Sequence, residues 1–196
     1  MKKQNGIREF LNQNPVIPVV KIEQLDTVIP LIKFLDKKGI HCVEITLRSN
    51  CALEAIIIAK KYAPSHFKIG VGTVKDRLQL SNVIDLKVDF IVLPGLNLEL
   101  VELLKQTQIP FLPGVITPTE IMKSLELGWN TLKFFPANIA GGIDALKTFS
   151  HVFPEVSFCP TGGVNKVNYK DYLNLDNVLS VGGSWVQKEF ITQFKL

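Results

Sequence analysis

The sequence is poor in the residues that usually hold metals or build disulfide frameworks. It contains three cysteines and three histidines among 196 residues. The cysteines are odd in number and far apart, so we expect reduced, buried thiols. The histidines have no metal-ligand spacing to one another or to the cysteines, and no metal or other cofactor is predicted. These residues are Cys42, Cys51, Cys159, His41, His66 and His151.

Long hydrophobic runs and blocks of one charge are also missing. The first ten residues carry no apolar segment of the signal-peptide type, and no later run is long enough to span a bilayer. We therefore expect a cytoplasmic protein with no membrane partner. The net charge is only +4, without a basic run, which argues against nucleic acid. A mild positive balance suits a small anionic metabolite.

What is present is a regular alternation of two patterns. Apolar residues make up 46% of the chain and no linker or low-complexity segment interrupts it, so we predict one domain over residues 1–196. Eight strand-like runs alternate with helix-like runs. The predicted strands are 16–22, 41–47, 68–74, 90–95, 111–116, 131–137, 157–164 (with its loop) and 178–186. The predicted helices are 4–13, 25–37, 52–62, 76–86, 98–106, one opening at 117, 142–149 and 169–173.

Strict alternation predicts a parallel sheet, and eight units are the number that closes a (β/α)8 barrel with a short leading helix. The alternative is an open doubly wound sheet. It is weaker because no complete G-x-G-x-x-G follows the first strand. The fragment Gly70-Val71-Gly72 is better explained by glycines that make room inside a barrel.

A lysine lies in the middle of the predicted strand 131–137. A buried ammonium without a partner is very costly, so Lys133 either lies in water on an edge strand or has a function. Alternation places Lys133 and Phe135 on one face. In the second strand, Glu44, Thr46 and Arg48 alternate with apolar residues and should point into the barrel. The alternative for this strand is a buried Glu44–Arg48 ion pair without a catalytic role.

Inward residues of even-numbered strands can share a layer across a barrel, which brings Glu44 toward Lys133. An amine beside a carboxylate suits nucleophilic amine catalysis with proton transfer. Thr73 ends the third strand and could reach the interior, and Pro94-Gly95 forms a turn near the mouth.

Two glycine-rich loops follow the seventh and eighth predicted strands. They are Thr161-Gly162-Gly163 and Gly182-Gly183-Ser184. The loops at these positions form the usual phosphate site of a (β/α)8 barrel. Glycines let backbone N–H groups approach an anion, and Thr161 or Ser184 can add a hydroxyl.

Together these segments resemble the bacterial 2-keto-3-deoxy-6-phosphogluconate (KDPG) aldolases, also known as 4-hydroxy-2-oxoglutarate aldolases. The resemblance covers nearly the whole chain in family order. The matching segments are Val43-Glu44-Ile45-Thr46-Leu47-Arg48, Gly70-Val71-Gly72-Thr73-Val74, Pro94-Gly95, Pro113-Gly114-Val115, Lys133-Phe134-Phe135-Pro136-Ala137, Phe158-Cys159-Pro160-Thr161-Gly162-Gly163 and Gly182-Gly183-Ser184-Trp185.

The resemblance implies a class I aldolase on a (β/α)8 barrel that forms a homotrimer. It assigns the Schiff base to Lys133 and the proton shuttle to Glu44. It implies that Arg48 and Thr73 bind the pyruvate carboxylate and its surroundings, and that Phe135 and Pro94 shape the pocket. The implied phosphate ligands are Gly162, Gly163, Gly183 and Ser184.

The implied reaction is reversible cleavage of KDPG to pyruvate and glyceraldehyde 3-phosphate, with 4-hydroxy-2-oxoglutarate as a further substrate. Many relatives carry a glutamate where this chain has Asn138, which bears on substrate preference. The chain ends at Leu196, so we expect a short or missing final helix. The alternatives are an aldolase for an unphosphorylated 2-keto acid, a phosphosugar isomerase, and a non-catalytic sugar-phosphate-binding barrel.

Overall fold

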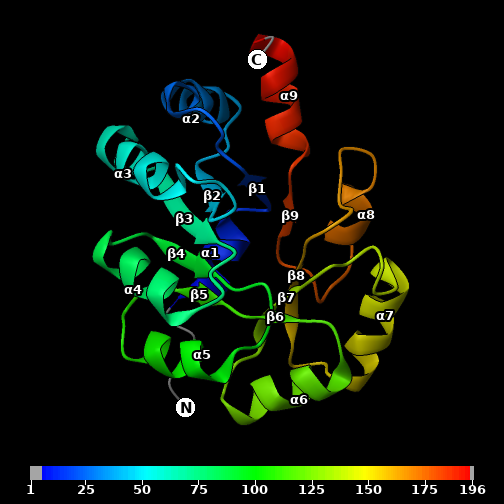
Figure 1. The fold of residues 1–196 in the computed structure, drawn as a ribbon. Coiled ribbons are helices and arrows are strands. Elements are labelled where there is room, and N and C mark those ends of the chain that lie inside the picture. Colours follow the sequence, from blue (N-terminus) through cyan, green and yellow to red (C-terminus); the bar gives the residue numbers. More distant parts are fainter. Residues whose placement is uncertain (1–5, 195–196) are drawn as a thin grey trace.

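The protein is a curled arrangement of parallel strands surrounded by helices (Figure 1). The computed structural model describes residues 6–194. The strands are β1 (Val16–Val20), β2 (Cys42–Thr46), β3 (Lys68–Gly72), β4 (Phe90–Val92), β5 (Phe111–Leu112), β6 (Gly114–Val115), β7 (Thr131–Phe134), β8 (Ser157–Pro160) and β9 (Val181–Gly183).

The helices follow the strands in alternation. They are α1 (Ile7–Gln13), the short 3-10 helix η1 (Leu25–Thr27), α2 (Val28–Lys37), α3 (Ala52–Tyr62), α4 (Arg77–Asp85), α5 (Leu98–Lys105), α6 (Pro118–Glu126), α7 (Gly142–Val152), α8 (Tyr169–Leu173) and α9 (Trp185–Phe194). No helix among residues 6–194 combines the length and the apolar composition that crossing a membrane requires.

The strands form two parallel sheets. Six strands are ordered β5-β4-β3-β2-β1-β9, and three are ordered β6-β7-β8. Isolated parallel bridges link Phe158 to Val178 and Thr161 to Gly182, between the β8 and β9 segments. Strands of a parallel sheet are covered on both faces, and all five residues of β2 are buried, the polar Glu44 and Thr46 included.

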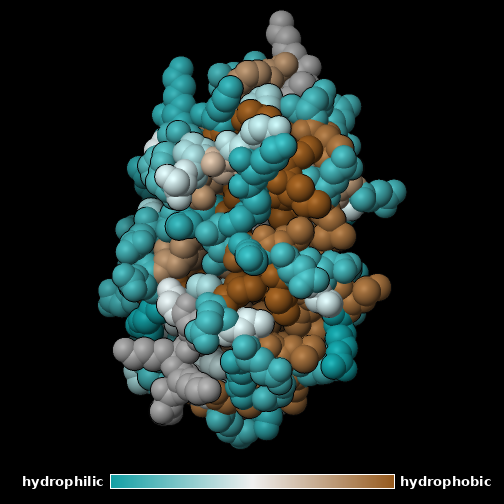
Figure 2. All heavy atoms as spheres, turned by 90° about the vertical axis from the view of Figure 1, so that its left-hand side faces the viewer, coloured by the Kyte–Doolittle hydropathy of each residue, from teal (hydrophilic) through white to brown (hydrophobic). Residues whose placement is uncertain are grey.

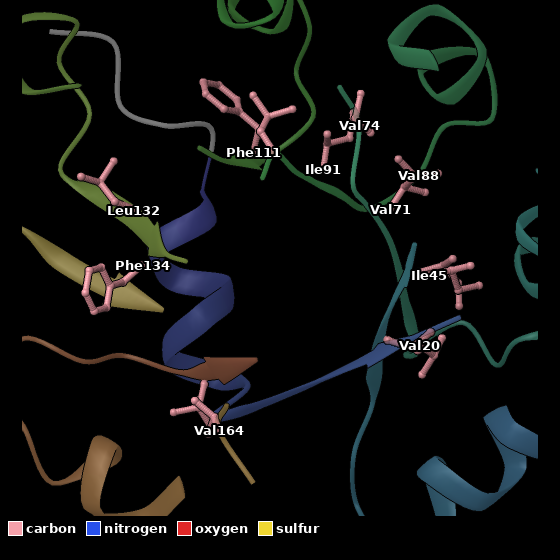
Figure 3. Packing of buried hydrophobic residues seen from close by; sticks show 14 of the residues in the cluster. Val20, Ile45, Val71, Val74, Val88, Ile91, Phe111, Leu132, Phe134 and Val164 are labelled. Atoms are coloured by element: carbon pink, nitrogen blue, oxygen red, sulfur yellow. The ribbon is translucent and has the colours of Figure 1, made fainter. Parts of the chain in front are cut away.

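The core has an outer and an inner part. In the outer part, side chains such as Val20, Ile45 and Val71 lie between the strands and the surrounding helices (Figure 3). The inner part contains Phe90 of β4 beneath α1, and the rings of Phe10 and Phe90 lie 4.5 Å apart between centroids. Helix α1 therefore covers one end of the strand assembly with apolar side chains.

Several predicted boundaries need correction. Predicted strand 111–116 is divided into β5 and β6 at Pro113, because proline has no N–H to donate to a neighbouring strand. The final helix, expected to be short or missing, is present. Strand β9 ends at Gly183, earlier than predicted, and the following residues form α9, which has ten residues like α2. The leading helix begins at Ile7, and the predicted start at residue 4 lies outside the described residues.

Candidate active site

A cleft with a volume of about 250 Å³ lies at the carboxyl ends of the strands. Every residue predicted for the site contributes to its lining. These residues are Glu44, Arg48, Thr73, Pro94, Lys133, Phe135, Thr161, Gly162, Gly163, Gly183 and Ser184. The cleft therefore brings these residues together, and their roles as a site stay predictions.

Lys133 lies on β7, which is paired on both sides by β6 and β8. The alternative of a solvated edge strand is therefore wrong, and the residue is only 5% exposed. Its Nζ lies 3.6 Å from Glu44 Oε1 and 5.0 Å from the centroid of the Phe135 ring. A buried amine thus faces one carboxylate and one aromatic ring.

Glu44 reaches this position because the neighbouring strand makes room for it. The residue is 3% exposed, and its Oε1 has no hydrogen-bond partner among residues 6–194. A Cβ on Gly72 of β3 would lie 1.8 Å from that oxygen. Gly72 is therefore needed for the close approach of the carboxylate. A buried carboxylate oxygen that lacks a hydrogen bond costs stability and is typical of a functional site.

Arg48 is held by a short chain of hydrogen bonds rather than by Glu44. Its Nε donates to Thr46 Oγ1 at 3.0 Å, and that hydroxyl donates to the Val20 carbonyl at 2.8 Å. Among the described residues, no ion pair joins Glu44 to Arg48, and the carboxylate pairs instead with Lys133. The alternative of a purely structural Glu44–Arg48 pair is not supported by this geometry.

Backbone conformation shapes the rest of the cleft. Thr73, directly after β3, has φ of +63°, which is uncommon for a residue with a side chain. Gly162 and Gly163 have φ of +93° and +81°, where glycine is strongly favoured. A Cβ on Gly163 would come within 2.3 Å of the Asn138 side chain. The residue that departs from the family pattern therefore lies against this glycine loop.

Sequence reasoning missed some of the lining. Val19, Lys75 and Val164 also contribute to the cleft. Val19 lies in a run of four buried residues on β1, so the sequence did not show which of them faces the cleft. Lys75 is an exposed cation in a loop, where no strand or helix periodicity indicates the direction of a side chain.

Cys159 lies beside the cleft, but its thiol is unreactive. It pairs in register with Lys133 across β7 and β8. Burial raises the pKa of its thiol to about 12, although the nearby Lys133 opposes this shift. The thiol therefore stays protonated at neutral pH and is a poor nucleophile.

Comparison with known proteins agrees with this site. Residues 7–194 match the family model of KDPG and KHG aldolase, where KHG is 4-hydroxy-2-oxoglutarate. The KHG/KDPG aldolase of Escherichia coli (strain K12) is 39% identical over 183 residues, which cover 93% of this chain and 85% of that protein. The 2-dehydro-3-deoxy-phosphogluconate aldolase of Dickeya dadantii has the same identity and coverage.

Solved structures show the same similarity. The KDPG aldolase of Legionella pneumophila, with pyruvate captured as a covalent carbinolamine, is 41% identical with a TM-score of 0.91, covering 99% of this chain and 93% of that one. The Zymomonas mobilis enzyme with 3-phosphoglycerate is 36% identical with a TM-score of 0.89, covering 96% and 93%. The chain therefore belongs to the KDPG and KHG aldolase family and is a class I, Schiff-base aldolase.

Proposed function

We propose that the protein reversibly cleaves KDPG to pyruvate and glyceraldehyde 3-phosphate, with Lys133 as the Schiff-base residue and 4-hydroxy-2-oxoglutarate as a second substrate. The observation that carries the assignment is the burial of Lys133 in the cleft, 3.6 Å from Glu44. The captured carbinolamine in the Legionella pneumophila relative supports amine chemistry on pyruvate.

The reaction begins when the Lys133 amine adds to the C2 ketone and forms a carbinolamine. Loss of water gives a protonated imine, which draws electrons from the substrate. When the C4 hydroxyl loses its proton, the C3–C4 bond breaks, its electron pair enters the enamine, and glyceraldehyde 3-phosphate leaves. Protonation at C3 and addition of water then release pyruvate and restore the amine. We assign the proton transfers to Glu44, because its carboxylate faces Lys133 across the cleft.

We assign the pyruvate carboxylate to Arg48 and Thr73. Because the Nε of Arg48 is bonded to Thr46, the terminal guanidinium nitrogens are left to bind an anion. Pro94 and Phe135 complete this part of the cleft and limit the shape of the substrate.

The phosphate would bind at the opposite part of the lining. Gly162 and Gly163 lie in one loop, Gly183 and Ser184 in the other, and the Thr161↔Gly182 bridge holds the two together. Backbone N–H groups of such loops can surround a phosphate, and Thr161 can add a hydroxyl. The 3-phosphoglycerate in the Zymomonas mobilis relative supports a site for a phosphorylated ligand.

Borohydride reduction in the presence of pyruvate tests the imine. We expect a stable adduct on Lys133, located by peptide mass spectrometry, and no adduct in Lys133→Met. Labelling of another lysine, or none, would discard the mechanism. Comparing kcat/KM for KDPG and 4-hydroxy-2-oxoglutarate tests the phosphate assignment. Equal values would favour an aldolase for unphosphorylated 2-keto acids.

We also propose that the two sheets form one closed (β/α)8 barrel within a single domain. Supporting this are the bridges between the β8 and β9 segments and the separation of β5 from β6 by Pro113 alone. In this arrangement β5 and β6 count as one strand position.

A homotrimer in the cytoplasm is the proposed working form. Large apolar side chains are exposed on α3 and α4, including Leu53, Ile57 and Leu78. Figure 2 shows hydrophobic side chains gathered on the side of the molecule that carries these helices. The cysteines are free, which suits a reducing compartment. Light scattering tests the assembly, and Ile57→Lys should weaken it if α3 lies in the interface.

A further inference from the structure

The fold brings together three possible metal ligands at the opposite end from the cleft. Asp36 lies in the last turn of α2, His41 directly precedes β2, and His66 lies just before β3. Asp36 Oδ1 lies 3.0 Å from His41 Nδ1 and 2.7 Å from His66 Nε2. Because the cleft lies at the carboxyl ends of the same strands, this cluster is separated from it by the length of β2, about 16 Å.

We propose that Asp36, His41 and His66 form a binding site for a divalent transition-metal ion such as Zn²⁺. One ligand atom from each residue lies within 4.8 Å of the others. In a tetrahedral zinc site with bonds of about 2.0–2.1 Å, ligand atoms lie about 3.3 Å apart. The two Asp36–histidine distances, 3.0 and 2.7 Å, are shorter than this, so the imidazoles need to move back slightly to admit the ion. Both are exposed, so this movement does not disturb the core.

The backbone around the cluster is fixed and the neighbouring cations are already paired. The Lys68 N–H donates to the His41 carbonyl at 2.8 Å, which joins the starts of β2 and β3. Lys68 Nζ lies 3.7 Å from Asp89, and Lys38 lies 3.0 Å from Glu189. The metal would replace the two histidine protons that now face Asp36, and a water can fill the fourth position. Its role would be to tie α2 to the starts of two strands.

Calorimetric titration of the full chain with ZnCl₂ tests this site. We expect one saturable equivalent and a higher melting temperature, with Lys133 labelling by pyruvate unchanged. His66→Gln and Asp36→Asn should lose both effects. His151→Gln removes an exposed histidine from α7 and is the matched control. The proposal is overturned if wild type shows no saturable binding, if His66→Gln binds like wild type, or if His151→Gln loses binding.

An independent observation concerns the loop after β8. The Gly163 carbonyl accepts hydrogen bonds from the side-chain amides of Asn165 and Asn168, both at 3.2 Å. The two asparagines are also bonded to each other, because the Asn165 N–H donates to Asn168 Oδ1 at 2.8 Å. Neither asparagine lines the cleft, whereas Gly163 and Val164 do.

We infer that Asn165 and Asn168 are positioning residues that direct the Val164 N–H into the cleft. In a trans peptide the C=O and N–H point to opposite sides. Holding the Gly163 carbonyl on the asparagine side therefore turns the Val164 N–H toward the cleft. That N–H has no hydrogen-bond partner within residues 6–194. This inference rests on the proposed phosphate site, to which it adds one backbone donor.

Kinetics of Asn165→Ala and Asn168→Ala on two substrates test the inference. We expect KM for KDPG to rise about tenfold or more, since a hydrogen bond to a charged group is lost, while kcat and the KM for 4-hydroxy-2-oxoglutarate stay unchanged. Asn174→Ala, at the end of α8, is the control. If wild type prefers KDPG but the variants keep its KM, the positioning role is wrong. If wild type shows no preference for KDPG, the phosphate site itself fails.

Discussion

A single methyl group added at Gly72 should lower the catalytic rate and leave the stability of the fold nearly unchanged. In Gly72→Ala, the new Cβ would lie 1.8 Å from Oε1, 2.5 Å from Cδ and 2.7 Å from Cγ of Glu44. The end of that side chain must move by about 1.5 Å to reach ordinary van der Waals contact. Because Glu44 is flexible, it can swing away, so the cost to folding should be small. The carboxylate would nevertheless leave its position beside Lys133.

A misplacement of about 1 Å can lower an enzymatic rate by about 10²-fold. We therefore expect kcat of Gly72→Ala to fall by about that factor with little change in melting temperature. Turnover is followed by coupling pyruvate release to lactate dehydrogenase, and stability is followed by circular dichroism on heating.

Gly70→Ala is the matched control, two residues earlier on the same strand. Its Cβ would meet the Phe90 ring at 2.1–2.4 Å, and that ring packs against Phe10. An aromatic ring in a packed core cannot swing aside, and overpacking typically costs about 1–3 kcal/mol. Gly70→Ala should thus lose stability and keep its kcat when folded. If Gly72→Ala keeps full turnover and instead melts as early as Gly70→Ala, the placement of Glu44 is not what Gly72 provides.

Three further predictions use other parts of the chain. Glu44→Gln keeps the size of the side chain but removes its titration, so turnover should fall about 10²–10⁴-fold while the circular dichroism spectrum stays native. Nearly full turnover together with lower thermal stability would instead show that Glu44 has a structural role. Iodoacetamide at pH 8 should label the partly exposed Cys51, while Cys42 and Cys159 stay unmodified because burial raises both pKa values to about 12; mass spectrometry of the native protein reads this out. Thr117→Ala removes the cap of α6 and should cost about 1 kcal/mol in urea unfolding, whereas an unchanged midpoint would show that the capping box contributes nothing.

The elements with clear periodicity or capping signals could be predicted closely from the sequence. Helix α3 has the predicted bounds of 52–62, and α8 those of 169–173. The capping box between Thr117 and Glu120 is also present as expected. These elements were predictable because local interactions determine them. Strand ends were predicted less well, since a strand ends where its neighbour ends, and the neighbour is distant in sequence.

The site could be predicted where alternation and topology act together. The face shared by Glu44 and Arg48 follows from a period of two, and the even-numbered strands brought Glu44 to Lys133. The orientation of the Arg48 side chain could not be predicted from the sequence, because its hydrogen bond to Thr46 depends on side-chain conformation. The meeting of Asp36, His41 and His66 was also missed, since three separate elements supply it.

The geometry at the centre of the cleft favours chemistry over stability. At 3.6 Å, Lys133 and Glu44 are close enough to attract each other but too far apart for a good hydrogen bond. A buried ion pair with imperfect geometry is weak support for a fold, and well-packed apolar residues of similar size are often more stable. A tighter pair would hold the amine in place and keep it from a ketone. The distance between the two groups instead leaves the amine able to form a bond with carbon, which is what a Schiff-base aldolase requires.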